Sequence, residues 1–316
     1  MLILMLVFAH FRSASIRFDY QNADFSYIYG WNNVFTCFYM PAFFVISGFC
    51  SNFQKSVNLF LLSLFKGLII PLLALSVIND IGYAIVISGS DLRAVCFETI
   101  QEGGTLWFLQ ALILAKLICY AIYNISRNVK YGICVTLFLL FIGVALNQLK
   151  VDKTNFFSYQ HAFVASFFVI LGVYMNENRT WYVKASKLCL YGYPFISILS
   201  FWKSPNITAC LSVSMKMVPL FLLLSISGTL FIMALCEKIN KCRILEFWGR
   251  NSLVVYALHF TPLLFLFNVY YNWLQPSHFL QMLEFVVLLY LTEYALCYVL
   301  IKVFQCVPFK WLLGKF

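Results

Sequence analysis

Charged residues are scarce in this chain of 316 residues. They make up 11% of it, whereas 62% of the residues are hydrophobic and 19% are aromatic. About a quarter of an ordinary soluble domain is charged. So much apolar surface cannot be hidden inside one soluble core, which excludes a soluble globular protein. The composition therefore predicts an all-α fold, a polytopic integral membrane protein built as a helix bundle.

The chain also lacks the signals of separate domains and of metal sites. It has no Pro-rich or Gly-rich linker, no low-complexity run, and no polar segment long enough to form a soluble domain. We therefore expect residues 1–316 to form a single transmembrane domain. None of the 11 cysteines lies in a C-x-x-C pair and the four histidines are dispersed, so we expect neither a metal site nor a redox site.

About ten apolar runs are candidates for transmembrane helices, because about 20 helical residues cross the hydrocarbon core of a bilayer. In chain order they lie near Met1–Phe11, Val34–Ser51, Leu68–Ser88, Thr105–Tyr123, Tyr131–Leu149, Phe156–Met175, Leu188–Trp202, Met215–Cys236, Leu253–Trp273 and Phe279–Cys306. The first run is short because Arg12 follows it directly, and the seventh contains Pro194.

The basic residues predict the orientation of these spans. An even number of spans puts both termini on one side of the membrane. If that side is the cytoplasm, 14 of the 22 Lys and Arg residues lie in inner loops, 7 in outer loops, and Lys116 within a span. Cytoplasmic loops carry the excess of basic residues, so we expect both termini in the cytoplasm. The net charge of +10 then reflects anchoring on anionic lipid, and no nucleic acid partner is expected.

Three short motifs follow one another along the chain. His10 ends an apolar stretch and is followed by M-P-x-F-F-x-I-S-G-F at residues 40–49. W-F-L stands at residues 107–109, and G-x-N-S-L-x-x-Y-x-x-H stands at residues 249–259. This order resembles the membrane-bound acyltransferase 3 family, and within it the fucose 4-O-acetylase-like O-acyltransferases. In the family, a basic residue precedes the histidine at a position that here falls ahead of Met1, so the resemblance implies that the first helix is incomplete at its N-terminus.

The resemblance implies an O-acyltransferase of the bacterial cytoplasmic membrane. It would move an acyl group, expected to be acetyl, from acetyl-CoA or another acyl-CoA to a hydroxyl of a cell-envelope saccharide or lipid-linked saccharide. His10 would be the catalytic base, a role that suits imidazole because it changes charge near neutral pH. The alternative for His10 is a structural histidine at the membrane interface, bonded to a neighbour or to water.

The resemblance also implies two groups of binding residues. The candidates for substrate binding are Glu102, Trp107, Asn251, Tyr256 and His259. The candidates for contact with the phosphates of coenzyme A are Arg250 and Lys66. Tyr256 and His259 are three residues apart and would share one face of a helix. Only Lys66 and Pro71 match the more basic run that the family has ahead of a proline.

Each of these residues also has a plain structural interpretation. Trp107 could belong to the aromatic belt at the membrane surface, and Glu102 could be solvated. Asn251 or Ser252 could cap the start of a helix. His259 could bond to a backbone carbonyl, and Arg250 could anchor lipid.

Two other functions are compatible with the same sequence. A transporter or flippase of a lipid-linked saccharide would also have many aromatic-rich spans, although an inverted repeat is not visible. The short first helix suggests another interpretation, a protein that has lost its catalytic activity. Glu293, in the middle of the last span, is a candidate for pairing with Lys116 or for accepting a hydrogen bond from a tyrosine.

Overall fold

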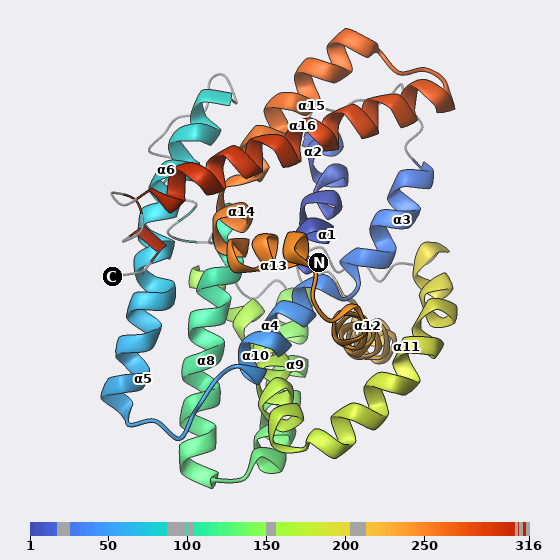
Figure 1. Cartoon of the computed structure of the whole chain (residues 1–316). Helices are drawn as coiled ribbons and strands as arrows, with labels where there is room; N and C mark the ends of the chain where they lie inside the picture. The colour runs from blue at the N-terminus through green and yellow to red at the C-terminus, as the bar shows by residue number, and fades with distance from the viewer. Residues whose placement is uncertain are drawn as a thin grey trace.

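The computed structural model describes residues 1–17, 26–86, 96, 99, 101, 104–149, 156–202, 213–306, 309, 312 and 313. Within these residues every regular element is helical, which confirms the all-α prediction (Figure 1). The elements are α1 (Leu2–Ala9), α2 (Phe11–Arg17), α3 (Ser26–Thr36), α4 (Tyr39–Phe49), α5 (Val57–Leu64), η1 (Phe65–Ile69), α6 (Ile70–Val86), η2 (Gly104–Leu106), α8 (Trp107–Ser126), α9 (Val129–Gln148), η3 (Phe156–Ser158), α10 (Tyr159–Glu177), α11 (Arg179–Trp202), η4 (Met215–Met217), α12 (Val218–Ile239), α13 (Arg243–Arg250), α14 (Ser252–Leu258), α15 (Phe260–Leu274) and α16 (Phe279–Gln305).

Six helical stretches of the described chain are long and apolar enough to cross a membrane. They are Val57–Val86, Gly104–Ser126, Val129–Gln148, Phe156–Glu177, Met215–Ile239 and Phe279–Gln305. Helices α14 and α15 make a seventh if they are counted as one span bent by 52°. The membrane helix bundle is therefore confirmed, whereas the predicted number of about ten spans is too high for the residues that the structure describes.

Breaks in the helices explain part of this difference. The expected first span falls in α1 and α2, which together give only the short apolar helix Leu2–Ile16. The expected span Val34–Ser51 is divided between α3 and α4, which Phe38 separates with φ −133° and ψ −19°. Neither part alone has the roughly 20 residues that cross the hydrocarbon.

Pro41 and Ser225 explain how the break before α4 is stabilised. Pro41 lies in the first turn of α4 and has no N–H to offer to the Cys37 carbonyl, four residues earlier. The Ser225 hydroxyl on α12 donates to that carbonyl at 2.8 Å. An unpaired carbonyl would be costly in an apolar interior, so this contact ties α12 to the break.

Helix α10 lies at the centre of the bundle. In the helical stretch Phe156–Glu177, to which it belongs, 78% of the most apolar 18 residues are buried. It packs against α4, α8 and α9. The contact with α4 is close because two glycines face it. A Cβ added at Gly48 would overlap the backbone of Val169, and one added at Gly172 would overlap the backbone of Val45. Small residues allow membrane helices to approach in this way.

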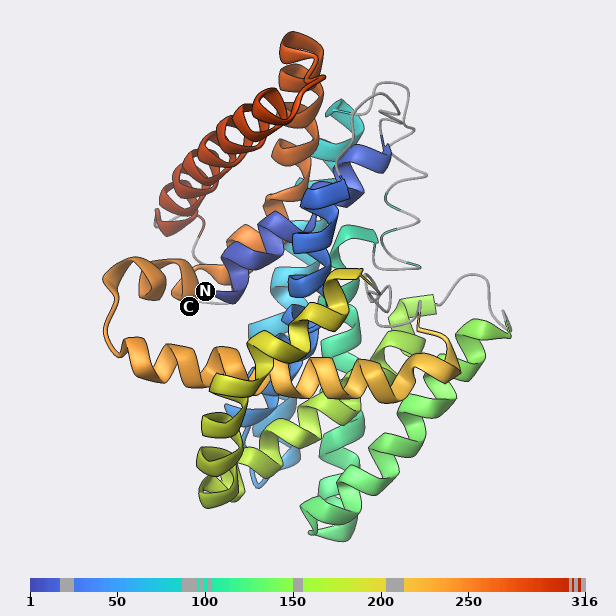
Figure 2. The same cartoon turned by 90° about the vertical axis from the view of Figure 1, so that its right-hand side faces the viewer.

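The remaining helices surround this centre in different directions. Helix α12 is seen end-on in Figure 1 and lies across the bundle in Figure 2. Helices α15 and α16 extend beyond the rest at one end. At the other end lie the starts of α5 and α9 and the turn from α10 to α11. The close pairs α4–α10 and α8–α10 form the frame on which the candidate site is built.

Candidate active site

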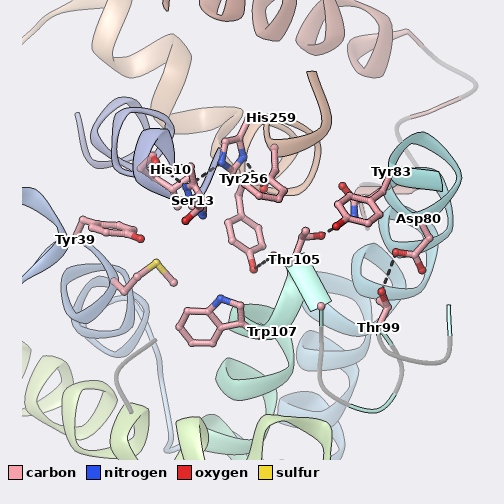
Figure 3. Close-up of a pocket in the computed structure, with 15 residues that line it drawn as sticks. His10, Ser13, Tyr39, Asp80, Tyr83, Thr99, Thr105, Trp107, Tyr256 and His259 are labelled. Atoms are coloured by element: carbon pink, nitrogen blue, oxygen red, sulfur yellow. Dashed lines mark hydrogen bonds between the residues drawn. The ribbon is translucent and has the colours of Figure 1, made fainter. Parts of the chain in front are cut away.

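A cavity of about 320 Å³ lies among α1, α4, α6, α8 and α14 (Figure 3). Four of the predicted site residues line it, namely His10, Trp107, Tyr256 and His259. The fold therefore brings together residues from the start, the middle and the end of the chain. The volume is in the range of pockets that bind small ligands.

His10 lies at the C-terminal end of α1, and other helices hold this end in place. The last carbonyl groups of a helix find no partner within the helix itself. Side chains of α16 and α3 satisfy several carbonyls of α1. The bonds run from the Tyr290 hydroxyl to the Phe8 carbonyl (3.0 Å), from the Tyr294 hydroxyl to the Leu4 carbonyl (2.9 Å), and from Asn32 Nδ2 to the Ala9 carbonyl (2.9 Å).

Backbone carbonyls determine which nitrogen of each histidine carries the proton. His10 Nδ1 lies 2.9 Å from the Leu6 carbonyl, and His259 Nδ1 lies 2.8 Å from the Val255 carbonyl. A carbonyl oxygen can only accept a hydrogen bond, so Nδ1 is the donor in both rings. In a neutral imidazole, Nε2 is then the acceptor. His259 Nε2 accordingly lies 3.2 Å from His10 Nδ1, as a second acceptor for the same proton.

This arrangement leaves His10 Nε2 as an unprotonated nitrogen. Within the described part of the chain, no group forms a hydrogen bond with it. The His10 ring is partly exposed and lines the cavity, whereas the His259 ring is 2% exposed. The ring centroids are 4.8 Å apart with an interplanar angle of 70°. His10 is therefore the imidazole that is equipped to take a proton from a bound ligand.

A proline explains why His259 stands at a break between two helices. Pro262 has no N–H for the Leu258 carbonyl, four residues earlier, and its ring would collide with that carbonyl in a regular helix. Helices α14 and α15 meet here at an angle of 52°. The signal for this bend is present in the sequence, because Pro262 stands three residues after His259 in an apolar run.

Tyr256 fixes the start of α8, which carries Trp107. Its hydroxyl donates to the Thr105 carbonyl at 3.1 Å and accepts from the backbone N–H of Phe108 at 3.2 Å. The first N–H groups of a helix lack partners, and Leu106 at the N-cap provides no side-chain acceptor. Tyr256 thus caps α8 from another helix and positions Trp107 in the cavity wall (Figure 3).

We expect Tyr256→Phe to lower the stability of the protein by about 1–3 kcal/mol, because the buried N–H of Phe108 would lose its partner. The midpoint of thermal unfolding in detergent measures this effect. Tyr191→Phe is the matched control, since the side chain of Tyr191 is 70% exposed. Equal midpoints for the two variants would contradict the capping role of Tyr256.

A polar group at the side of the cavity formed by α6 was missed by sequence analysis. Asn79 and Asp80 are each 3% exposed and line the cavity. Asn79 donates to the Thr105 hydroxyl at 2.6 Å and accepts from the Thr261 hydroxyl at 3.3 Å. Asp80 accepts from the Thr99 hydroxyl at 2.8 Å. An Asn-Asp pair inside an apolar span is a signal for a functional site that could have been used.

Comparison with known proteins supports the family that the motifs suggested. A family model described as an acyltransferase domain matches residues 1–302. The chain belongs to the acyltransferase 3 family. No curated protein and no solved structure matches the chain significantly. The protein is therefore a membrane acyltransferase. The family match names neither the acyl donor nor the acceptor.

Two predicted site residues of this acyltransferase lie outside the cavity lining. Asn251 is the N-cap residue of α14, but its side chain does not cap the helix. Its amide donates to the Phe247 carbonyl at 2.7 Å and accepts from Gln305 at 3.2 Å. The side chain of Arg250 is 81% exposed and lies 3.6 Å from the carboxylate of Glu246.

The other two predicted binding residues, Lys66 and Glu102, are not found among the described residues that line the cavity. Lys66 lies in the π-helical turn η1, inside the continuous helical stretch Val57–Val86. Pro71, the second residue of α6, has no N–H for the carbonyl of Gly67 in η1, four residues earlier. Lys66 does not line the cavity of His10. Glu102 lies outside the described residues.

Proposed function

We propose that this acyltransferase moves an acyl group, with acetyl expected, from acyl-CoA to a hydroxyl of a cell-envelope saccharide. The observation that supports the proposal most is that His10 lines a cavity and that its Nε2 atom has no hydrogen-bond partner among the described residues. Acyl transfer to an alcohol needs a base at this point, because the hydroxyl must lose its proton as it attacks the thioester carbonyl.

The reaction then follows from the two nitrogens of His10. Nε2 takes the proton of the acceptor hydroxyl while its oxygen attacks the thioester carbonyl. The imidazolium keeps its Nδ1–H bond to the Leu6 carbonyl, which holds the ring in one orientation. When the C–S bond breaks, the leaving thiolate takes the proton from Nε2, so that free coenzyme A and the acyl ester are formed. His259 Nε2 orients the same ring as a second acceptor.

The lining of the cavity supports a saccharide as the acceptor. Aromatic rings offer flat apolar surfaces for sugar rings, and amide, hydroxyl and carboxylate groups bind sugar hydroxyls. The aromatic residues of the lining include Tyr39, Tyr83 and Trp107, and the polar ones include Ser13, Asn79, Asp80, Thr99 and Thr105. The proposal places the protein in the bacterial cytoplasmic membrane, as the family resemblance implies. The twofold excess of basic residues in inner loops was counted on ten spans, and the described chain has six or seven, so cytoplasmic termini stay an expectation from the sequence.

Transport of a lipid-linked saccharide is the second candidate, because broken helices such as α14 and α15 are common in transporters. Cells lacking the gene and complemented with the wild-type chain separate the two functions. We measure the O-acetyl content of the surface polysaccharide and, independently, its amount at the surface. Lost acetyl groups on a normal amount of polysaccharide are expected for the acyltransferase. Lost export with acetylation retained would favour the transporter.

A further inference from the structure

A second cavity, of about 280 Å³, carries two lysines and no acidic residue. Its lining is formed by Cys50, Ser51, Asn52, Phe53, Lys55, Phe60, Ser63, Leu64, Gly67, Leu68 and Lys116. Lys55 follows α4, and Lys116 lies in the middle of α8. The hydroxyl and amide groups of Ser51, Asn52 and Ser63 are neutral, so the charge of this cavity is positive.

Lys116 is costly in its position unless it binds an anion. It lies in an apolar span, where an ammonium group is expensive and usually has a function. Among the residues that the structure describes, no acidic side chain forms an ion pair with Lys116 or Lys55. Glu293, a predicted partner, accepts instead from Cys297 at 3.4 Å. Glu177, which lines a neighbouring cavity, accepts from the Tyr123 hydroxyl at 3.2 Å.

The loop with Lys55 is held firmly against α8. The Tyr120 hydroxyl donates to the Lys55 carbonyl at 2.8 Å, and Tyr120 is one helical turn after Lys116. The Tyr120 ring stacks on Phe60 with centroids 4.0 Å apart and an interplanar angle of 11°. Asn124 donates to the carbonyl of Phe53 at 3.3 Å. The backbone at Lys55 is therefore fixed against α8, the helix that carries Lys116.

The π turn η1 forms another part of the wall of this cavity. Gly67 and Leu68 of η1 line it, and a side chain added at Gly67 would meet no atom within 4 Å. A π turn inserts an extra residue into a helix and is frequent at functional sites. The wall therefore has open space at Gly67.

The two cavities lie at different levels of the same two helices. On α8, Trp107 lines the first cavity and Lys116 lines the second. These two residues are about 14 Å apart along the helix axis. Met40 of α4 lines the first cavity, and Cys50, the C-cap residue of α4, lines the second. These two residues are about 15 Å apart along the helix axis. A ligand with an anionic head and a long thin arm fits this spacing.

We propose that Lys55 and Lys116 bind the phosphate groups of the acyl-CoA donor, whose thioester arm extends along α4 and α8 toward His10. This inference rests on the proposed function. Lysine binds phosphate as a point charge, and two ammonium groups match the charge of a diphosphate. The turns at this end of the bundle also carry Arg127 and Arg179, which strengthens the attraction for an anion (Figure 1).

Binding of coenzyme A to the purified full-length protein in nanodiscs of uncharged lipid tests the site without turnover. Lys116→Gln and Lys55→Gln are each expected to raise the Kd of coenzyme A by about tenfold or more. Lys116→Arg keeps the charge and is expected to restore binding, which excludes a folding defect. Lys241→Gln, in the connection between α12 and α13, is the matched control and should leave Kd unchanged. In the acyltransferase assay, the KM for acetyl-CoA should rise with little change in kcat.

Each other outcome has a defined meaning. An unchanged Kd in both glutamine variants would overturn the site, even if wild-type protein transfers acetyl groups. Binding that the variants weaken, in a wild-type protein without any acyl transfer, would support the phosphate site and reject the proposed function. Binding of phosphatidylglycerol that the variants abolish, with coenzyme A binding unaffected, would overturn the donor assignment and identify a lipid site.

Discussion

Replacing His10 with alanine is expected to lower the rate of acyl transfer by about 10²–10⁴-fold, the usual contribution of a general base. The reason is that Nε2 of His10 is the unprotonated nitrogen of a ring on the cavity wall, because Nδ1 carries the proton and donates it in a hydrogen bond to the Leu6 carbonyl. The release of coenzyme A thiol by the purified protein, with and without saccharide acceptor, measures the effect on kcat.

Two further histidine variants make this test specific. His259→Ala removes only the second acceptor of the His10 Nδ1 proton, since the bond to the Leu6 carbonyl remains. We expect a smaller loss of rate than for His10→Ala. His278→Ala, at the exposed N-cap of α16, should have no effect. An active His10→Ala protein together with an inactive His259→Ala protein would assign the base to His259.

Replacing Gly48 with alanine is expected to destabilise the protein by about 1–3 kcal/mol or more. The new Cβ would overlap the backbone of Val169 on α10, and a backbone cannot move aside as a flexible side chain can. Helices α4 and α10 would have to separate, and α10 is the most buried of the candidate spans. The midpoint of thermal unfolding in detergent measures the loss.

Gly192→Ala is the matched control for this substitution. Gly192 also lies in a helix, α11, but an added Cβ meets no atom within 4 Å. Alanine is preferred over glycine in a helix by about 0.5–1 kcal/mol, so this variant should be slightly more stable. Shifts of the same sign in both variants would contradict the close α4–α10 contact.

The sequence predicted much of the site because the family motifs are local. His10, Trp107, Tyr256 and His259 were each found within a short motif, and all four line one cavity. The fold class was predictable from composition alone, since a chain with 11% charged residues cannot be soluble. Local signals of this kind do not depend on how distant helices pack.

The parts that were not predicted depend on contacts between distant segments. The bond from the Tyr256 hydroxyl to the N–H of Phe108 joins residues 148 positions apart, and no local pattern reveals it. The side chain of Asn251 bonds to Gln305 of α16 instead of capping α14. The number of spans was overestimated because apolar runs do not show where a helix breaks, as at Phe38.

The hydrogen bonds between α1 and α16 join the first helix of the chain to the last one. Tyr290 and Tyr294 hold the helix that carries His10, yet the ribosome makes α16 last and α1 first. A nascent chain that already contains every family motif through His259 still lacks these two tyrosines. The carbonyls of Leu4 and Phe8 therefore gain these two partners only after residues 279–305 have been inserted, whereas Asn32 of α3 can bond to Ala9 earlier.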